Sequence, residues 1–223
     1  VIAPGNTEEC FYAAITAIEW AERYQGPVIV LSEHSLAERS QNIPTPNLDS
    51  IKKAQRKTYS GSNGYQRYDG FELSPMPIPG NPGAYIANGS EHDAMGDTTH
   101  LPARHIQMTE RRFSKLQLLE DGNYESEHNQ EPIAIMPWGG SKGPVWDAYQ
   151  ELLNSGVNLG WYYTMCLHPL PLALLKELQT KELVLVPELN YQGQFSRLLR
   201  SQGIQAQSIT QYTGCLLYTS PSP

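Results

Sequence analysis

The segment at 131–154, EPIAIMPWGGSKGPVWDAYQELLN, restricts the fold more than any other part of the chain. It predicts a buried strand at 133–138, a glycine turn at 139–143 and an amphipathic helix that begins at Pro144. The apolar residues of this helix recur at the spacing that lays one helix face on a sheet. A strand, a turn and a helix in this order form one unit of an α/β sheet, and functional sites usually lie at the carboxyl ends of such strands.

Comparable units lie on both sides of this segment. Before it, Asn6 and Glu9 have the spacing of a capping box at a helix start. The buried stripe of that helix is expected at Phe11, Ala14, Ile15 and Ile18. A strand buried on both faces is expected at 28–31, and further strands at 157–165, 182–187 and 206–210, separated by helices. This alternation predicts an α/β fold with a mainly parallel sheet.

Between the two α/β regions, proline and glycine are too frequent for long helices from 40 to 89. A connector with short strands and one helix, at 102–119, is expected here. The buried face of that helix is expected at Ile106, Thr109, Phe113 and Leu116. The predicted domains are 1–45 as the end of a first α/β domain, 46–130 as the connector, 131–214 as a second α/β domain and 215–223 as a tail.

The chain is expected to be a fragment of a longer protein, truncated at both ends. The chain begins at Val1, and its first residues have the pattern of the end of a strand. The residues at 215–223, CLLYTSPSP, are what a transposase-type sequencing adapter encodes in one reading frame, so we predict that they are adapter-derived. A disordered tail rich in serine and proline is the alternative.

Charge, hydropathy and cysteine content narrow the class of protein. The net charge of −7 excludes the basic face that a nucleic acid requires. No apolar run approaches the roughly 20 residues that span a bilayer. The cysteines are too few and too scattered for a disulfide framework, which predicts a reducing, cytoplasmic environment. Cys10 and Cys166 are expected to be buried apolar groups.

The glycine turn is a weak candidate for binding a phosphate. Gly139, Gly140, Ser141 and Lys142 could offer backbone N–H groups and one positive charge at a helix start. Their spacing fits neither of the common phosphate-binding glycine motifs. A tight turn with a packing role is therefore the favoured interpretation.

Residues that follow predicted strands at their carboxyl ends are candidates for lining a pocket. They are Gly5, Asn6, Thr7 and His34. A histidine that faces a pocket has a pKa suited to proton transfer, and an exposed surface histidine is the favoured alternative for His34.

Several residues of the metal-ligand type gather in one stretch of the connector. They are Glu91, His92, Asp93, Asp97, His100 and His105. Because the last two are five positions apart, they do not share a helix face. A hydrogen-bonded polar loop is favoured, and no metal site is predicted.

A series of short motifs occurs in the order and spacing of one known family. The motifs are PGNTEECF at 4–11, PVIVLSEHSLAER at 27–39, LDSI at 48–51, EHD at 91–93 with Gly96, ERRFSKL at 110–116, WGGSKGP at 138–144 and ELNYQGQ at 188–194. Through them the chain resembles the alpha subunit of 2-oxoacid:ferredoxin oxidoreductases, and the 2-oxoglutarate branch in particular. The resemblance extends from 1 to 214.

The resemblance implies both a fold and an activity. It implies the end of a thiamine-diphosphate pyrimidine-type domain at 1–45 and a transketolase C-terminal-like domain at 131–214. The implied reaction is the oxidative decarboxylation of a 2-oxoacid, with 2-oxoglutarate favoured, to an acyl-CoA. Thiamine diphosphate, Mg²⁺ and a [4Fe–4S] cluster would belong to the full complex, with a beta subunit, ferredoxin and coenzyme A as partners. Neither nucleic acid nor a membrane is expected as a partner.

The chain also departs from the family pattern. The YPITPS-type segment, the RGGPSTG-type substrate loop and the carboxylate that activates the aminopyrimidine ring would all lie before Val1. No catalytic residue is therefore expected in this chain, which by itself should bind no cofactor and be inactive. The open alternatives are a pyruvate oxidoreductase, a transketolase-like dehydrogenase subunit, and a non-catalytic assembly or electron-transfer subunit.

The turn at 188–194 is expected to contact another subunit. Tyr191 offers a large amphipathic anchor of the kind that often carries interface energy. The alternative is that Glu188 and Asn190 only cap the helix that follows.

Overall fold

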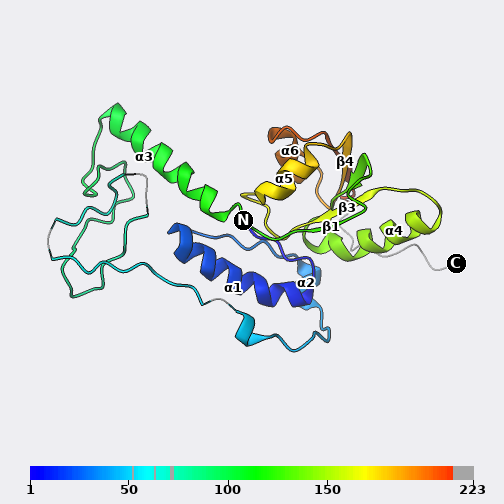
Figure 1. Cartoon of the computed structure of the whole chain (residues 1–223), viewed down its shortest axis with the longest axis horizontal. Coiled ribbons are helices and arrows are strands. Elements are labelled where there is room, and N and C mark those ends of the chain that lie inside the picture. Colours follow the sequence, from blue (N-terminus) through cyan, green and yellow to red (C-terminus); the bar gives the residue numbers. More distant parts are fainter. Residues whose placement is uncertain (52, 63, 71–72, 213–223) are drawn as a thin grey trace. The chain divides into compact units, whose positions relative to one another are not determined.

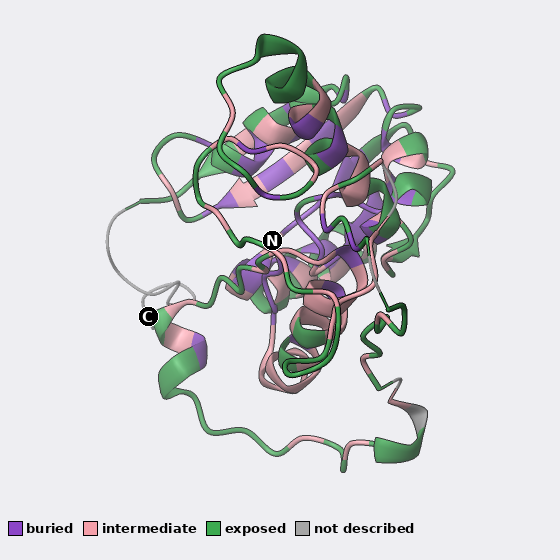
Figure 2. Ribbon diagram, turned by 90° about the vertical axis from the view of Figure 1, so that its left-hand side faces the viewer, coloured by how far each residue is buried: buried purple, intermediate pink, exposed green. Residues whose placement is uncertain are grey.

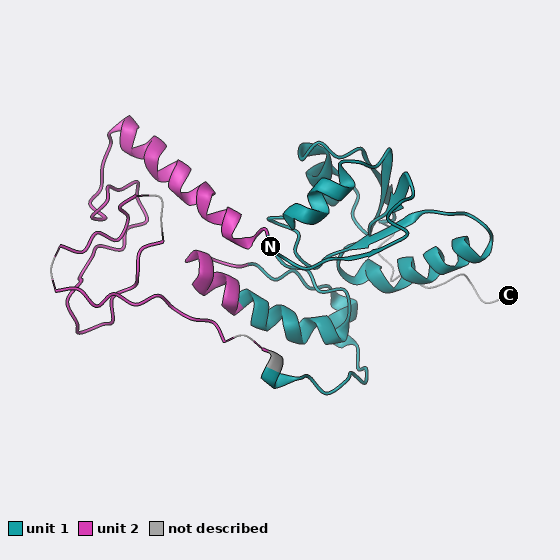
Figure 3. Ribbon diagram, in the orientation of Figure 1, with its two compact units in different colours: residues 1–17, 29–49, 121–223 teal, residues 18–28, 50–120 magenta. Residues whose placement is uncertain are grey.

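The computed structural model describes residues 1–212 except 52, 63, 71 and 72. The predicted tail at 215–223 lies outside the described residues. By compactness the chain forms two units, which we describe separately (Figure 3). The first unit comprises 1–17, 29–49 and the chain from 121 onward, and the second comprises 18–28 and 50–120. The domain limits at 45 and 130 stay a prediction.

The first unit is built on a sheet whose five described strands have the order β1-β3-β2-β4-β5 (Figure 1). The strands are β1 (Glu125–Glu127), β2 (Ile133–Ile135), β3 (Gly160–Tyr163), β4 (Leu183–Glu188) and β5 (Ala206–Thr210). β2 is parallel to β3 and to β4, and β4 is parallel to β5, whereas β1 pairs antiparallel with β3. The prediction of an α/β fold with a mainly parallel sheet is confirmed.

Helices pack against both faces of this sheet because neighbouring strand residues, such as Tyr162 and Tyr163, point to opposite sides. The helices are α4 (Lys142–Asn154), α5 (Leu172–Leu178) and α6 (Gln194–Ser201), and a 3-10 turn, η3 (Gly139–Ser141), precedes α4. One core contains Ile135, Val145, Tyr149, Leu159, Trp161 and Tyr163. The other contains Ala134, Tyr162, Val184, Leu174 of α5 and Leu199 of α6, among others. Of the predicted apolar face of α4, at Val145, Ala148, Tyr149 and Leu152, the first and third are buried as predicted, whereas Ala148 and Leu152 are exposed.

The central strand–turn–helix segment differs from its prediction at both boundaries. β2 ends at Ile135, so the strand is shorter than the predicted 133–138. α4 begins at Lys142 and not at Pro144, because η3 already gives Ser141 a helical backbone with φ −71° and ψ −10°. Pro144 is therefore the third residue of the helix, inside the first turn, where no intrahelical N–H is required.

The start of the chain pairs with two other segments of the first unit. Ile2 forms a parallel bridge with Val30 and an antiparallel bridge with Cys166. The strand predicted at 28–31 is reduced to this bridge, and the side chains of Ile29, Val30 and Leu31 are 56%, 42% and 43% exposed. The prediction that this strand is buried on both faces is therefore wrong, since one bridge partner cannot cover it.

Three helices follow the bridge and its turn: α1 (Thr7–Tyr24), α2 (His34–Glu38) and the 3-10 helix η1 (Leu48–Ser50). The buried residues of α1 include Ala13 and Trp20, whereas Ala14 and Ile18 of the predicted stripe are exposed. The predicted stripe is wrong, because apolar and aromatic residues occupy more than one face of the helix and a different face is buried.

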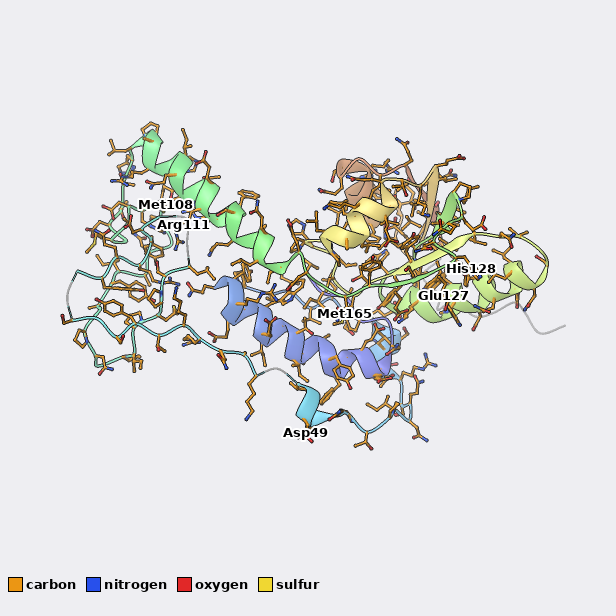
Figure 4. The ribbon with its side chains drawn as sticks, viewed as in Figure 1. Asp49, Met108, Arg111, Glu127, His128 and Met165 are labelled. Carbon is orange, nitrogen blue, oxygen red and sulfur yellow. The ribbon has the colours of Figure 1, made fainter. Side chains whose placement is uncertain are left out.

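The second unit contains α3 (Pro102–Ser114), the 3-10 helix η2 (Lys115–Leu119) and long irregular segments, which are largely exposed in Figure 2. Met108 and Arg111 are buried on α3 and point towards the irregular segments of the same unit (Figure 4). Ile106 and Phe113 are 57% and 68% exposed, so the predicted buried face of this helix is wrong. Arg111 is buried beside the ring of Tyr68, and its Nη2 donates to the Arg67 carbonyl. Among the helices described, none combines the length and the apolar character needed to cross a membrane.

Candidate functional site

The first unit contains a cavity of about 350 Å³ beside the start of α4. It is lined by residues of the turn before α1, of the segment at 33–41 and of the segment at 140–146, together with Glu125 of β1. A second cavity, of about 260 Å³, shares Glu33 and Gly140 with the first. The volume of the larger cavity is within the range of small-molecule sites. It lies beside the turn that follows β2, at the edge where such sheets place their ligands.

The turn before α1 is shaped by a capping box. Asn6 Oδ1 accepts the N–H of Glu9 at 2.8 Å, which confirms the predicted cap. Glu9 Oε2 reaches back one residue further than usual and accepts the N–H of Gly5 at 2.7 Å. The reciprocal bonds satisfy backbone donors that a helix start leaves without partners, and they hold Gly5 and Asn6 at the cavity wall.

An ion-pair network links this turn to α4 and to the sheet. Lys142 Nζ donates to Glu9 Oε1 at 2.6 Å and to Glu125 Oε1 at 2.7 Å. The hydroxyl of Tyr163 donates to Glu9 Oε2. The pKa of Tyr163 is raised well above its usual value, first by burial and then by the charge of Glu9, so the hydroxyl stays protonated at neutral pH.

The backbone and side chains of the glycine turn are in close contact with other groups of the protein. Gly139 has a φ of 54°, the left-handed region that favours glycine. Gly140 lies directly against the carboxylate of Glu33, so any side chain there would collide with it. Ser141 Oγ accepts the N–H of Trp138 at 3.3 Å and donates to its carbonyl at 2.8 Å.

These contacts show whether the residues of the glycine turn can bind a phosphate. The carboxylate of Glu33 brings a negative charge to the turn, and the ammonium of Lys142 is already shared by two carboxylates. Among the described residues, Gly139, Gly140, Ser141 and Lys142 therefore do not fit a diphosphate, whose charge would be repelled here. A tight turn with a packing role is the interpretation that these contacts favour.

The structure brings only some of the predicted pocket residues together. Gly5 and Asn6 line the larger cavity. Thr7 does not line it, and its hydroxyl donates to Gln41 Oε1 at 3.4 Å. The side chain of His34 is 78% exposed and lies 3.3 Å from Glu38, as the surface alternative requires. The role of all four in a ligand site stays a prediction.

Three residues of the network were missed as site residues at the sequence level. The sequence identifies Glu9 only as a helix cap, and it gives no signal of a site at Tyr163 or Glu125. A strand with consecutive aromatic residues, GWYY at 160–163, is an ordinary core pattern. No local signal shows that the hydroxyl of Tyr163 meets the carboxylate of Glu9.

In the second unit, the residues of the metal-ligand type form a hydrogen-bonded loop. Glu91 accepts from Arg112 Nη2 at 2.7 Å and contacts His105, and these bonds lower the pKa of Glu91 to about 2, with Arg112 as the main cause. Asp93 accepts the N–H groups of Met95 and Asp97, and the bond from Met95 is the main reason that its pKa is lowered. The described residues contain no cluster of three metal-ligand side chains.

The turn that follows β4 shows the capping contacts expected of Glu188 and Asn190. The carboxylate of Glu188, only 2% exposed, accepts the N–H groups of Phe195 and Ser196 at 2.9 and 3.0 Å. Asn190 Oδ1 accepts the N–H of Gln194 at 3.1 Å. Tyr191 is 71% exposed and has edge-to-face contact with Tyr212. A contact between Tyr191 and another subunit stays a prediction.

The two described cysteines differ in burial. Cys166 is 3% exposed, as expected, and burial raises the pKa of its thiol to about 11. Cys10 is only half-buried, so the prediction that it is a buried group is wrong, and its pKa is also raised, mainly by burial. Neither thiol is activated as a nucleophile, because a thiolate is disfavoured at both positions.

Comparison with known proteins relates the chain to one family. Residues 1–111 match the family described as "Pyruvate flavodoxin/ferredoxin oxidoreductase, thiamine diP-bdg". The solved 2-oxoglutarate:ferredoxin oxidoreductase from Magnetococcus marinus, with 2-oxoglutarate, coenzyme A and succinyl-CoA bound, matches 94% of this chain and 38% of its own, with a TM-score of 0.85 and 35% identity.

Curated relatives agree with the structural match. The 2-oxoacid:ferredoxin oxidoreductase 2, subunit alpha, of Aeropyrum pernix is 30% identical over 90% of this chain and 33% of its own length. The 2-oxoglutarate oxidoreductase subunit KorA of Mycobacterium tuberculosis is 28% identical over 96% of this chain and 34% of its own length. The chain thus spans about a third of the length of these relatives. Its predicted likeness to the alpha subunits of 2-oxoacid:ferredoxin oxidoreductases is confirmed.

Proposed function

We propose that the chain is part of the alpha subunit of an oxidoreductase that converts 2-oxoglutarate and coenzyme A to succinyl-CoA. The observation that carries this proposal is the match over 94% of the chain to an enzyme solved with these three molecules bound. The KorA relatives, which are named for 2-oxoglutarate, support the same substrate. The whole enzyme's activity is assigned here by homology, since the chain covers only part of its relatives.

We propose that the cofactors are held by other parts of the complex. Thiamine diphosphate, when bound, would stabilise the carbanion that forms on loss of CO₂ from the 2-oxoacid. The glycine turn of this chain does not fit its diphosphate, and the two described cysteines, Cys10 and Cys166, cannot supply four thiolates to a [4Fe–4S] cluster. We therefore place the diphosphate, Mg²⁺ and cluster ligands in other parts of the complex, including a beta subunit, with ferredoxin as the electron acceptor.

We assign the cavity of about 350 Å³ to the ligand-binding region of the enzyme. It contains the two pocket candidates Gly5 and Asn6, and its wall also includes Trp146 and Arg39. A mixed wall of aromatic, charged and backbone groups is typical of sites for small molecules. The described thiols form no disulfide, which supports a cytoplasmic location.

The test is the activity of the full-length alpha subunit co-expressed with its partner subunits. We expect reduction of ferredoxin that requires both 2-oxoglutarate and coenzyme A. A preference for pyruvate over 2-oxoglutarate would move the enzyme to the pyruvate branch. Assembly without turnover of any 2-oxoacid would favour a non-catalytic subunit.

The isolated chain provides a second test. Titration with thiamine diphosphate and Mg²⁺ in a calorimeter should give no saturable heat, because the glycine turn does not fit a diphosphate. Binding in the micromolar range would contradict the assignment of the cofactor to other parts of the complex.

A further inference from the structure

Glu9 is the residue on which the contacts beside the larger cavity converge. Gly5 N–H and the Tyr163 hydroxyl donate to its Oε2, and Lys142 Nζ donates to its Oε1. A longer bond runs from Asn6 Nδ2 to Oε1 at 3.4 Å. A carboxylate has about four acceptor positions, so these donors occupy all of them. Glu9 therefore has no acceptor position left for a ligand.

The same partners hold Gly5 at close range. A Cβ on Gly5 would lie 2.6 Å from Tyr163 Oη and 2.8 Å from Lys142 Cβ, which leaves room for glycine alone. Lys142 Nζ also lies 3.9 Å from the ring centre of Tyr163. The side chains that bind Glu9 are thus the ones against which the Gly5 backbone rests.

We infer that Glu9 is a positioning residue that holds the Gly5–Asn6 wall of the cavity against Lys142 and Tyr163 without itself touching a ligand. Gly5, Asn6 and Lys142 line the cavity, whereas Glu9 lies behind this wall. The inference rests on the proposed function, in which this cavity takes part in substrate binding. A displacement of about 1 Å in such a wall is enough to change kinetics by orders of magnitude.

Glu9→Gln tests the inference with little change in shape. The amide keeps one acceptor oxygen, but its NH₂ group cannot accept. If the oxygen faces Lys142, the NH₂ meets the N–H of Gly5, which can only donate; in the opposite orientation it meets the ammonium of Lys142. In either orientation, one of the contacts that hold the Gly5–Asn6 wall in place is lost.

Glu8→Gln is the matched control. It makes the same change of charge one residue earlier on α1, and Glu8 does not line the cavity, while its side chain makes no hydrogen bond or ion pair among the described residues. Both variants are made in the full-length alpha subunit assembled with its partners and are assayed well below their melting temperatures. Tyr163→Phe, which removes one donor to Glu9 and keeps the ring, is a second variant in case Glu9→Gln does not fold.

The expected result is a split between kinetic constants. In Glu9→Gln, the KM for 2-oxoglutarate or for coenzyme A should rise about tenfold while kcat changes less than about threefold. The substrate whose KM changes is the one that uses the cavity. Tyr163→Phe should shift the same KM in the same direction by a smaller factor. KM values for both substrates within about twofold of the Glu8→Gln enzyme would overturn the inference.

Amide exchange separates this inference from the proposed function. The N–H of Gly5 should exchange about tenfold faster in Glu9→Gln than in Glu8→Gln, because the ammonium of Lys142 draws the amide oxygen to its side and Gly5 N–H then faces the NH₂ group, which cannot accept. If the wild-type complex turns over no 2-oxoacid, the proposed function fails, and equal exchange at Gly5 in the two variants would overturn the positioning role as well.

Discussion

The helices α4 and α6 follow parallel strands of one sheet, but different parts of the chain stabilise their first turns. At α6, Glu188 belongs to the strand just before the helix and accepts the N–H groups of Phe195 and Ser196. At α4, the carboxylate of Glu33 lies against the turn, and Glu9 binds Lys142 across 133 positions of sequence. A carboxylate near a helix N-terminus is favourable in both cases. The first arrangement is local, and the second exists only in the folded unit.

The two arrangements also leave different groups available. At α6, the cap is complete within the turn, so Tyr191 remains exposed. At α4, the distant carboxylates and Lys142 form part of a cavity wall. A helix start that is stabilised by charged groups from distant parts of the chain thus contributes to a cavity wall. A helix start that is capped within its own turn contributes only exposed surface.

The largest effect is expected from Lys142→Met. The change leaves Glu9 and Glu125 without the cation they share, and the side chain of Glu9 is only 17% exposed. We expect the free energy of unfolding to fall by about 3 kcal/mol, measured by chemical denaturation. Lys176→Met, at an exposed position of α5, is the control and should change it by less than about 0.5 kcal/mol. Similar losses in both variants would show that the distant contacts do not stabilise the start of α4.

A smaller loss of stability is expected from Glu188→Ala. The change leaves two buried N–H groups of α6 without an acceptor, which should cost about 2 kcal/mol of the free energy of unfolding. Glu188→Gln keeps one acceptor oxygen and should lose about half as much. If alanine at 188 is tolerated without loss, the start of α6 does not depend on its own strand.

Tyr191→Ala should leave the fold almost unchanged and weaken assembly. Its side chain is mostly exposed, so the subunit should lose less than about 0.5 kcal/mol of stability. Truncation of an interface anchor weakens association by on the order of 2 kcal/mol, which analytical ultracentrifugation of the full-length alpha subunit with its partner would detect. The control, Asn190→Ala, removes a cap worth about 1 kcal/mol and should leave association intact. An intact complex with Tyr191→Ala would leave this turn with a capping role alone.

The smallest effect is expected from deletion of 215–223. Both helix starts rest on contacts among residues that precede this tail. The melting temperature should therefore stay the same within error, as for removal of an unpacked terminus. A fall of several degrees would show that the tail packs as a native element and does not derive from an adapter.

Patterns that act over short distances could be predicted from the sequence. The mainly parallel sheet, the strand β5 and the cap of Asn6 on α1 were all predicted. Each depends on neighbours within a few residues or on the period of apolar positions, so its physical cause lies in residues that are close together in the sequence.

The faces of α1 and α3 could not be predicted in the same way. Ile18, Ile106 and Phe113 were expected to be buried and are exposed. Periodicity identifies positions that share a face, but when apolar residues occupy several faces, the packing partners decide which one is buried. In α3, the buried face includes the charged Arg111, which no apolar count would select.

By itself, the sequence determined the alternation of strands and helices from β2 onward, the cap at the start of α1 and, through its motifs, the likeness to the alpha subunits. Only the tertiary structure decided that Glu9 meets Lys142 and Tyr163, which lie 133 and 154 positions further along the chain. A hydrogen bond needs its atoms within about 3 Å, and nothing in the local sequence brings groups this far apart to that distance. Sheet pairing and helix packing do so, and they thereby form the wall of the cavity.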